Sequence, residues 1–378
     1  MRLALLLLLL IINQSCATNS NSDHNNVNTV KAKAGKHFSF QTWAGVEGFL
    51  GQVKFEVPKE HQLQTSTDGR AIEVIVPIRG SGPAMCSVRP RQLFSGQIIS
   101  SNYDYARNQY SGSAGPDVTF LFEHHPMVIV NQRYQSGQNL AFDKRGIVFL
   151  REYVLTCAQN GNWHPDSFAG FMKRVAKGIK LQYPHKKLVS RRVYQLMTKR
   201  TVRGFESHYL WQTAGTFYTE KVLTSFVLRP SQKVRILDRY ERLEWNGSGE
   251  LVQGDFQSIL NDKVVYKIAL GPTDSGMYLA AGSHKGQSFQ RRIQGPRYPL
   301  LPFWDAQNAK QLDHASFYDP NHTPYRFING TLSNPKPNLF NFKSKFFKTR
   351  IYMDDQGLPH RVIDRYSKQN YYRLLKIK

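Results

Sequence analysis

The chain has 378 residues, of which 40% are hydrophobic and 12% aromatic. This composition excludes a disordered chain, because disordered segments are poor in aromatic and other apolar residues. The length allows one large or two medium domains with a substantial core. The 51 Lys and Arg residues outnumber the 27 Asp and Glu residues, and the resulting net charge of +24 favours anionic partners.

The amino end has the pattern of an export signal. Met1 and Arg2 precede an unbroken apolar stretch, Leu3 to Ile12, and small and polar residues follow as far as Ala17. This stretch is too short to cross a bilayer, which needs about 20 apolar residues. Two cleavage points stay open. A cut after Ala17 would release a soluble protein, and a cut before Cys16 would leave a lipidated cysteine, as in bacterial lipoproteins.

We therefore predict an export signal over residues 1–16 and a flexible, Asn/Ser/Thr-rich tether over 17–36. The expected location is the periplasm or the outer membrane if the protein is bacterial, and the outside of the cell otherwise. A lipid on Cys16 would hold the protein at a membrane surface.

The remaining cysteines are Cys86 and Cys157. Exported proteins keep disulfides, so we predict one disulfide between these two residues. No nucleophile motif surrounds either cysteine.

Residues 37–162 are predicted to form a mixed, mostly β N-terminal region. Short runs rich in Val, Ile and Phe, separated by turn residues, are typical of strands. The predicted strands are Val53–Val57, Ala71–Ile78, Val118–Phe122 and Met127–Val130. The segment Gly146–Cys157 fits both a helix and a strand, and the sequence leaves the choice open.

Residues 163–204 are predicted to form a basic helical connector. From Pro165 to Ile179, Phe and Met residues recur at helical spacing and cations occupy the opposite side. A second, shorter helix is predicted from Ser190 to about Lys199.

The interval from Ser167 to Phe205 contains no Asp or Glu. We predict that its cations form a surface for an anionic partner, with a solvated face as the alternative. The candidate anion-binding residues are Lys173, Arg174, Lys177, Lys180, Lys186, Lys187, Arg191, Arg192, Lys199 and Arg200. A second set of cations that could extend this surface is Lys343, Lys345, Lys348 and Arg350.

Residues 205–378 alternate between apolar and polar residues and carry turn signals at short intervals, which predicts an antiparallel β region. Its last part predicts a hairpin in which Phe347, Thr349, Ile351 and Met353 share one face. The fold class that follows is α+β and predominantly antiparallel β. We expect a long β-meander or curved sheet in the C-terminal half, with amphipathic helices packed on it and a smaller mixed N-terminal region.

An enzyme is the weaker hypothesis. Glu123 and His125 would share a face if the strand from Val118 continued to His125, and such a pair could act as acid and base or bind a metal. No HExxH, GxSxG, Walker or GxGxxG motif occurs. We therefore predict no cofactor and no metal, and we keep a secreted hydrolase with a Glu/His site as the alternative.

The preferred hypothesis is a non-catalytic exported protein, with or without a lipid anchor. It would bind an anionic lipid, a lipopolysaccharide or a cell-wall polymer through its basic helical face. Export argues against nucleic acid as the partner.

Overall fold

A computed structural model provides the fold. It describes residues 37, 39–48, 52–65, 72–91, 94–110, 115–198, 201–228, 234–274, 276–298, 300, 312–346, 348–354, 359–364 and 370–375. The predicted export signal, the tether, the lipidation residue Cys16 and the candidate cations Lys199 and Arg200 lie outside these residues. The described chain is mostly antiparallel β and contains two helices.

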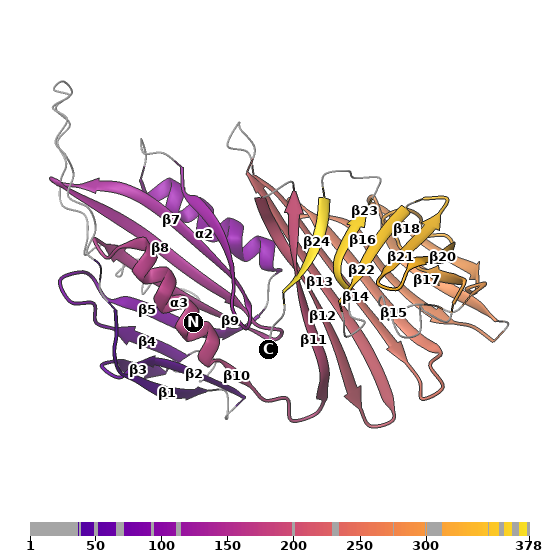
Figure 1. Ribbon diagram of the computed structural model, residues 1–378, viewed down its shortest axis with the longest axis horizontal. Coiled ribbons are helices and arrows are strands. Elements are labelled where there is room, and N and C mark those ends of the chain that lie inside the picture. Colours follow the sequence, from indigo (N-terminus) through magenta and orange to yellow (C-terminus); the bar gives the residue numbers. More distant parts are fainter. Residues whose placement is uncertain are drawn as a thin grey trace, which may run out of the picture.

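The N-terminal region contains two antiparallel sheets, which lie beside a much larger sheet in Figure 1. The smaller one has the order β1 (Trp43–Gly48), β2 (Val53–Pro58) and β10 (Lys180–Leu181). The other has seven strands in the order β3 (Gln62–Thr65), β4 (Ile72–Val76), β5 (Ala84–Pro90), β9 (Tyr153–Gly161), β8 (Asn139–Phe149), β7 (Pro126–Ser136) and β6 (Asp117–Phe122).

The strands predicted in this region are present, and the ambiguous segment Gly146–Cys157 belongs to strands β8 and β9. Strand pairing decides the ambiguity, because β8 is hydrogen-bonded to neighbours on both sides. Strand β4 buries Ile72, Val74 and Val76, whereas Glu73 and Ile75 are half-buried. One face of β4 is therefore buried and the other is partly covered.

Helix α3 (Pro165–Gly178) confirms the first predicted helix. His164 is its N-cap, and the side chain accepts a hydrogen bond from the backbone N–H of Asp166. Phe168, Phe171 and Met172 are buried in the core of the N-terminal region. The main contacts of α3 are with β2, β8 and β7. The helix therefore packs on the N-terminal region and not, as expected, on the C-terminal sheet.

The second predicted helix is wrong, because residues 190–199 fall largely in strand β11 (Lys187–Thr198). Val193, Leu196 and Met197 have helical spacing, but β11 is hydrogen-bonded to a strand on each side. These ladders satisfy the backbone along most of the segment. The basic connector of residues 163–204 is thus one helix followed by strands.

The 14-stranded sheet comprises the C-terminal half of the chain. Its strands, in spatial order, are β18 (Gln287–Gln294), β17 (Met277–His284), β16 (Lys263–Pro272), β15 (Leu251–Leu260), β14 (Val234–Trp245), β13 (Thr216–Leu228), β12 (Thr201–Thr213), β11, β24 (Asn370–Leu375), β23 (Pro359–Asp364), β22 (Lys348–Met353), β21 (Leu339–Ser344), β20 (Ile328–Lys336) and β19 (His314–Phe317). The predicted meander is confirmed over β12 to β18, and the predicted C-terminal hairpin is the β22–β23 pair. Phe347, which was predicted to begin this hairpin, lies outside the described residues.

The large sheet curls over itself. Tyr318 and Phe327, which lie between β19 and β20, pack into the same core as residues of β14 to β18 at the other end of the sheet. The ring centroids of Phe256 and Tyr318 are 4.9 Å apart, and those of Tyr278 and Phe327 are 5.2 Å apart. We call the face of the sheet that these two side chains cover the inner face.

Helix α2 (Ser95–Gln109) joins the two halves and was not predicted. It contacts β7 and β8 on one side and β13 and β14 on the other. Ile99 and Tyr103 are buried in a core that also contains Phe205, Phe226 and Ile236 of the large sheet. Ser, Asn and Tyr are poor helix formers, so this helix owes its stability to tertiary packing.

Candidate functional site

The cations of α3 form part of the predicted anion-binding surface. Lys173 and Lys177 are exposed on α3, and Lys180 is exposed on β10. In the described part of the chain none of these three lysines makes an ion pair. Lys180 lies directly opposite Lys54 of β2.

Two further cations, Arg174 and Lys54, complete this group. Arg174 of α3 pairs with Glu56 at 2.9 Å. Glu56 is two residues from Lys54 in the sequence and lies against Gly178 at the end of the helix. Lys54 pairs with Glu47 at 3.1 Å. Both ion pairs are exposed, and the attraction within such pairs is weak. We call Lys54, Lys173, Arg174, Lys177 and Lys180 the α3 basic cluster.

The other candidate cations do not extend this cluster. Lys186 forms an ion pair with Glu152, and its Nζ lies 4.3 Å from the ring centroid of Trp211. Arg191 donates hydrogen bonds to the ring of His125 and to the carbonyl of His124. These arginine and lysine side chains tie the N-terminal region to the large sheet. Two of the candidate cations, Lys186 and Arg191, are therefore held in contacts within the molecule.

The remaining two described candidates are Lys187 and Arg192. Lys187 is exposed at the start of β11, and Arg192 is half-buried opposite His208 of β12. In the second cation set, Lys343, Lys345 and Lys348 are exposed and Arg350 is half-buried.

The Glu123 and His125 pair is not arranged as the enzyme hypothesis requires. Strand β6 ends at Phe122, so Glu123 and His125 lie in the bend before β7 and not on one strand face. His125 is buried, and Arg191 donates to its Nδ1 at 2.9 Å. Burial, followed by the charge of Arg191, holds the pKa of His125 well below its usual value. The ring is therefore neutral, and its Nδ1 already accepts a hydrogen bond from Arg191.

The structure also describes no metal site. Among the described residues, no group of three or more His, Cys, Asp or Glu side chains is arranged to hold a metal ion. Neither of the two described helices has the length and apolar character needed to cross a bilayer.

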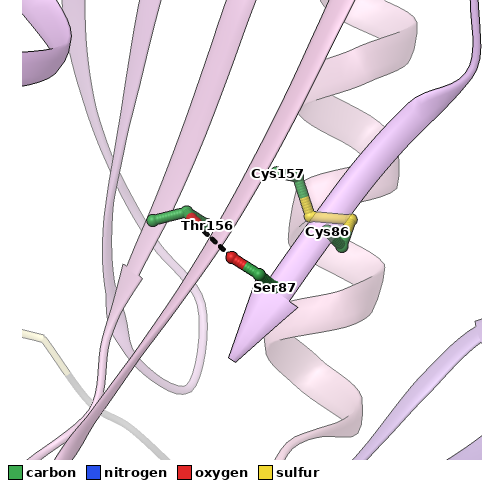
Figure 2. The surroundings of a disulfide bond; sticks show 4 residues. All are labelled: Cys86, Ser87, Thr156 and Cys157. Atoms are coloured by element: carbon green, nitrogen blue, oxygen red, sulfur yellow. Dashed lines mark hydrogen bonds between the residues drawn. A yellow bond between two sulfur atoms is a disulfide. The ribbon is translucent and has the colours of Figure 1, made fainter. Parts of the chain in front are cut away.

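The predicted disulfide is present. Cys86 of β5 and Cys157 of β9 are directly opposite each other in the strand register and are bonded through their sulfur atoms. Figure 2 shows the bond beside a hydrogen bond of 3.0 Å between the Ser87 and Thr156 hydroxyls on the same two strands. Both cysteines are buried. The disulfide is therefore part of the core and offers no exposed thiol.

A polar group on the inner face of the large sheet was missed by the sequence analysis. It consists of Glu206 and His208 of β12, Lys221 of β13 and Glu241 of β14. Phe256 lies on the inner face, and residues directly opposite each other in neighbouring strands share a face. Glu241 lies opposite Phe256, Lys221 lies opposite Glu241, and His208 lies opposite Lys221. Glu206 is two positions from His208 and shares its face. Acidic and basic residues two positions apart, as in "FESH" and "DRYERLE", are the sequence signal that could have revealed it.

Lys144 is an unexpected buried charge in the N-terminal region. Lys144 belongs to strand β8, and its side chain is fully buried. Its Nζ donates hydrogen bonds to the carbonyls of Phe142 at 3.0 Å and Gly161 at 3.3 Å. Burial lowers its pKa to about 7, against the raising effect of Asp143.

This lysine predicts a stability that depends on pH. Between pH 7 and 10 the unfolded chain holds the Lys144 proton and the folded chain does not, so the free energy of unfolding rises with pH, by up to about 1.4 kcal/mol per unit. Lys144→Met is expected to remove most of this rise between pH 7 and 9 in urea titrations. The exposed Lys177→Met should keep it. Equal slopes in wild type and Lys144→Met would show that the folded protein keeps the Lys144 proton.

Comparisons with known proteins do not identify a family. No family model and no curated protein matches the chain. One solved structure similar to it is a beta-barrel-like protein of the domain of unknown function DUF1849 from Brucella abortus. The match has 12% sequence identity and a TM-score of 0.37, and it covers 49% of this chain and 95% of that one. A likeness at this level assigns neither a fold family nor a function.

Proposed function

We propose that this protein binds an anionic lipid headgroup or an anionic polymer through the α3 basic cluster. The observation that carries the proposal is that Lys173, Lys177 and Lys180 are exposed on adjoining elements and make no ion pair with described residues. The net charge of +24 supports the same ligand class, because it concentrates anions around the whole molecule.

The packing of α3 favours binding by charge over insertion into a lipid layer. Phe168, Phe171 and Met172, the apolar side of the helix, are at most 4% exposed. Only the cationic side faces solvent, so an anionic surface would be held by electrostatic attraction of about 1 kcal/mol per cation. Salt should therefore weaken binding strongly.

An exported location belongs to the same proposal. An export signal over residues 1–16, with or without a lipid on Cys16, would place the cluster where envelope lipids and polymers are abundant. In this arrangement α3, packed on the N-terminal sheets, presents the cations.

The test is binding to lipid vesicles by sedimentation. Wild-type protein is expected to bind phosphatidylglycerol vesicles and not phosphatidylcholine vesicles. Reversing the charge of the three lysines, with Lys173→Glu, Lys177→Glu and Lys180→Glu together, should weaken binding at least about tenfold, since each cation contributes about 1 kcal/mol.

The matched control reverses three exposed cations of the large sheet, with Lys263→Glu, Lys267→Glu and Arg292→Glu together. It changes the net charge by the same amount but leaves α3 intact. Equal loss in both triple variants would show that binding follows net charge alone, and the α3 basic cluster would then lose its assigned role.

A further inference from the structure

The inner face of the large sheet contains polar side chains in two adjacent rows. Because strands β11 to β15 are in antiparallel register, Arg192, His208, Lys221, Glu241 and Phe256 follow one another directly across the sheet. The next row contains, in the same strand order, Tyr194, Glu206, Leu223, Arg239 and Ser258. Side chains of both rows point to the same face.

Two of the acids in and around these rows already have partners. Glu206 accepts a hydrogen bond from His208 at 2.6 Å and lies 3.9 Å from the Lys221 ammonium. Asp319, from the segment that crosses the inner face, is hydrogen-bonded to the His322 ring at 2.6 Å and accepts a hydrogen bond from the backbone N–H of Asn321 at 2.9 Å. Both carboxylates are therefore hydrogen-bonded within the described chain.

Glu241 and Arg239 are different. Glu241 is half-buried and makes no hydrogen bond or ion pair with any described residue, although Lys221 lies directly opposite it. Arg239 donates through Nη2 to Asn321 at 3.0 Å, but its Nε is buried and has no partner in the described chain. A buried donor without a partner is costly, so the Nε–H of Arg239 is available to donate to a ligand.

We propose that Lys221, Arg239 and Glu241 form a binding site for a small tetrahedral oxyanion, such as a phosphate ester or a sulfate. The Lys221 ammonium and the Arg239 Nε–H would donate to two of its oxygens, and Glu241 in its carboxylic acid form would donate to a third. This site is separate from the α3 basic cluster and does not depend on it.

The groups around Glu241 support this chemistry. Burial first, and then the negative charges of Asp319 and Glu206, raise its pKa to about 7, while Lys221 and Arg239 oppose the rise. Tyr266 of β16 lies nearby, and burial raises the pKa of its phenol to about 12, so this ring stays neutral. A carboxyl that takes up a proton near neutral pH can donate to an anion, whereas its ionised form would repel one.

Sulfate is the probe, because it remains a dianion between pH 6 and 8. Isothermal titration calorimetry at constant ionic strength is expected to show sulfate binding that tightens as the pH falls, by up to about tenfold from pH 8 to 6. Lys221→Met should weaken binding by roughly tenfold or more. Glu241→Gln, which can donate at any pH, should bind sulfate with little pH dependence. Lys267→Met, an exposed cation of β16, should leave the dissociation constant within about twofold.

Two further ligands distinguish the source of the anion. Glycerol phosphate presents a phosphate monoester free in solution, and phosphatidic acid vesicles present a phosphate monoester at a lipid surface. The natural ligand belongs to the class, soluble or lipid, whose binding affinity decreases in the Lys221→Met variant. The proposal is overturned if wild-type protein does not bind sulfate, if Lys221→Met and Glu241→Gln bind as wild type does at every pH, or if binding tightens as the pH rises.

Discussion

Replacing Glu220 by glutamine is expected to destabilise the protein by about 3 to 5 kcal/mol, because it leaves a largely buried guanidinium without its countercharge. Glu220 of β13 is 2% exposed and accepts hydrogen bonds from both nitrogens of the Arg151 fork, with Nε at 2.6 Å. The indole N–H of Trp211 donates to it at 2.8 Å and the hydroxyl of Tyr240 at 3.1 Å. This carboxylate ties the N-terminal region to the large sheet.

The free energy of unfolding in urea measures this effect. The double variant Glu220→Leu with Arg151→Met should be more stable than either single variant, since it buries no unpaired charge. If Glu220→Gln loses less than about 1 kcal/mol, the ion pair is solvated in solution and the two halves are not held as the structure indicates.

The same carboxylate gives a pH dependence with a definite sign. Burial alone would raise the pKa of Glu220, but the hydrogen bonds from Arg151 hold it below the usual 4.5. Its contribution to stability is therefore complete above pH 4.5 and is lost as the pH falls through the lower pKa of the folded state. The Glu220→Gln variant should lack this part of the acid transition.

Removing the disulfide is expected to cost about 4 kcal/mol, because it closes a loop between residues 71 positions apart and restricts the unfolded chain. The double variant Cys86→Ala with Cys157→Ala keeps the buried sites apolar. Guanidinium titrations should show the loss in the variant. They should also show it in wild-type protein after reduction.

The reduced wild type is the control for cavity effects, since it keeps both sulfur atoms. A reductant should leave the double variant unchanged. Should the reduced and oxidised wild type unfold at the same denaturant concentration, the cross-link does not contribute as the strand register implies.

The sequence predicted those parts of the fold whose signals are local. Alternating apolar residues and turn signals predicted the meander from β12 to β18, and the Phe and Met stripe with Pro165 at its start predicted α3. The disulfide followed from the small number of cysteines in a chain that we expect to be exported.

The errors have tertiary causes. Residues 190–199 have the spacing of a short helix, but the strands on both sides of β11 supply backbone partners along most of the segment. Helix α2 has weak intrinsic propensity and is held by a core shared between β7, β8, β13 and β14. Contacts between distant segments of the chain decide both cases.

The same distinction between local and tertiary signals separates the site residues that could be predicted from those that could not. The exposed lysines of α3 could be predicted from helical spacing, because the opposite side of the helix is apolar. The roles of Lys186 and Arg191 could not, because Glu152 and His125 become their partners only when the N-terminal region and the large sheet come together. The grouping of Lys221, Arg239 and Glu241 likewise requires the strand register.

Covalent labelling of lysines, with and without phosphatidylglycerol vesicles, tests the central claim most directly. Mass spectrometry after acetylation reports the labelling rate at each lysine. Binding through α3 predicts slower labelling of Lys173, Lys177 and Lys180 when vesicles are present, with no change at the exposed Lys263 and Lys267 of β16. Vesicles that bind the protein yet leave Lys173, Lys177 and Lys180 as reactive as before would contradict it.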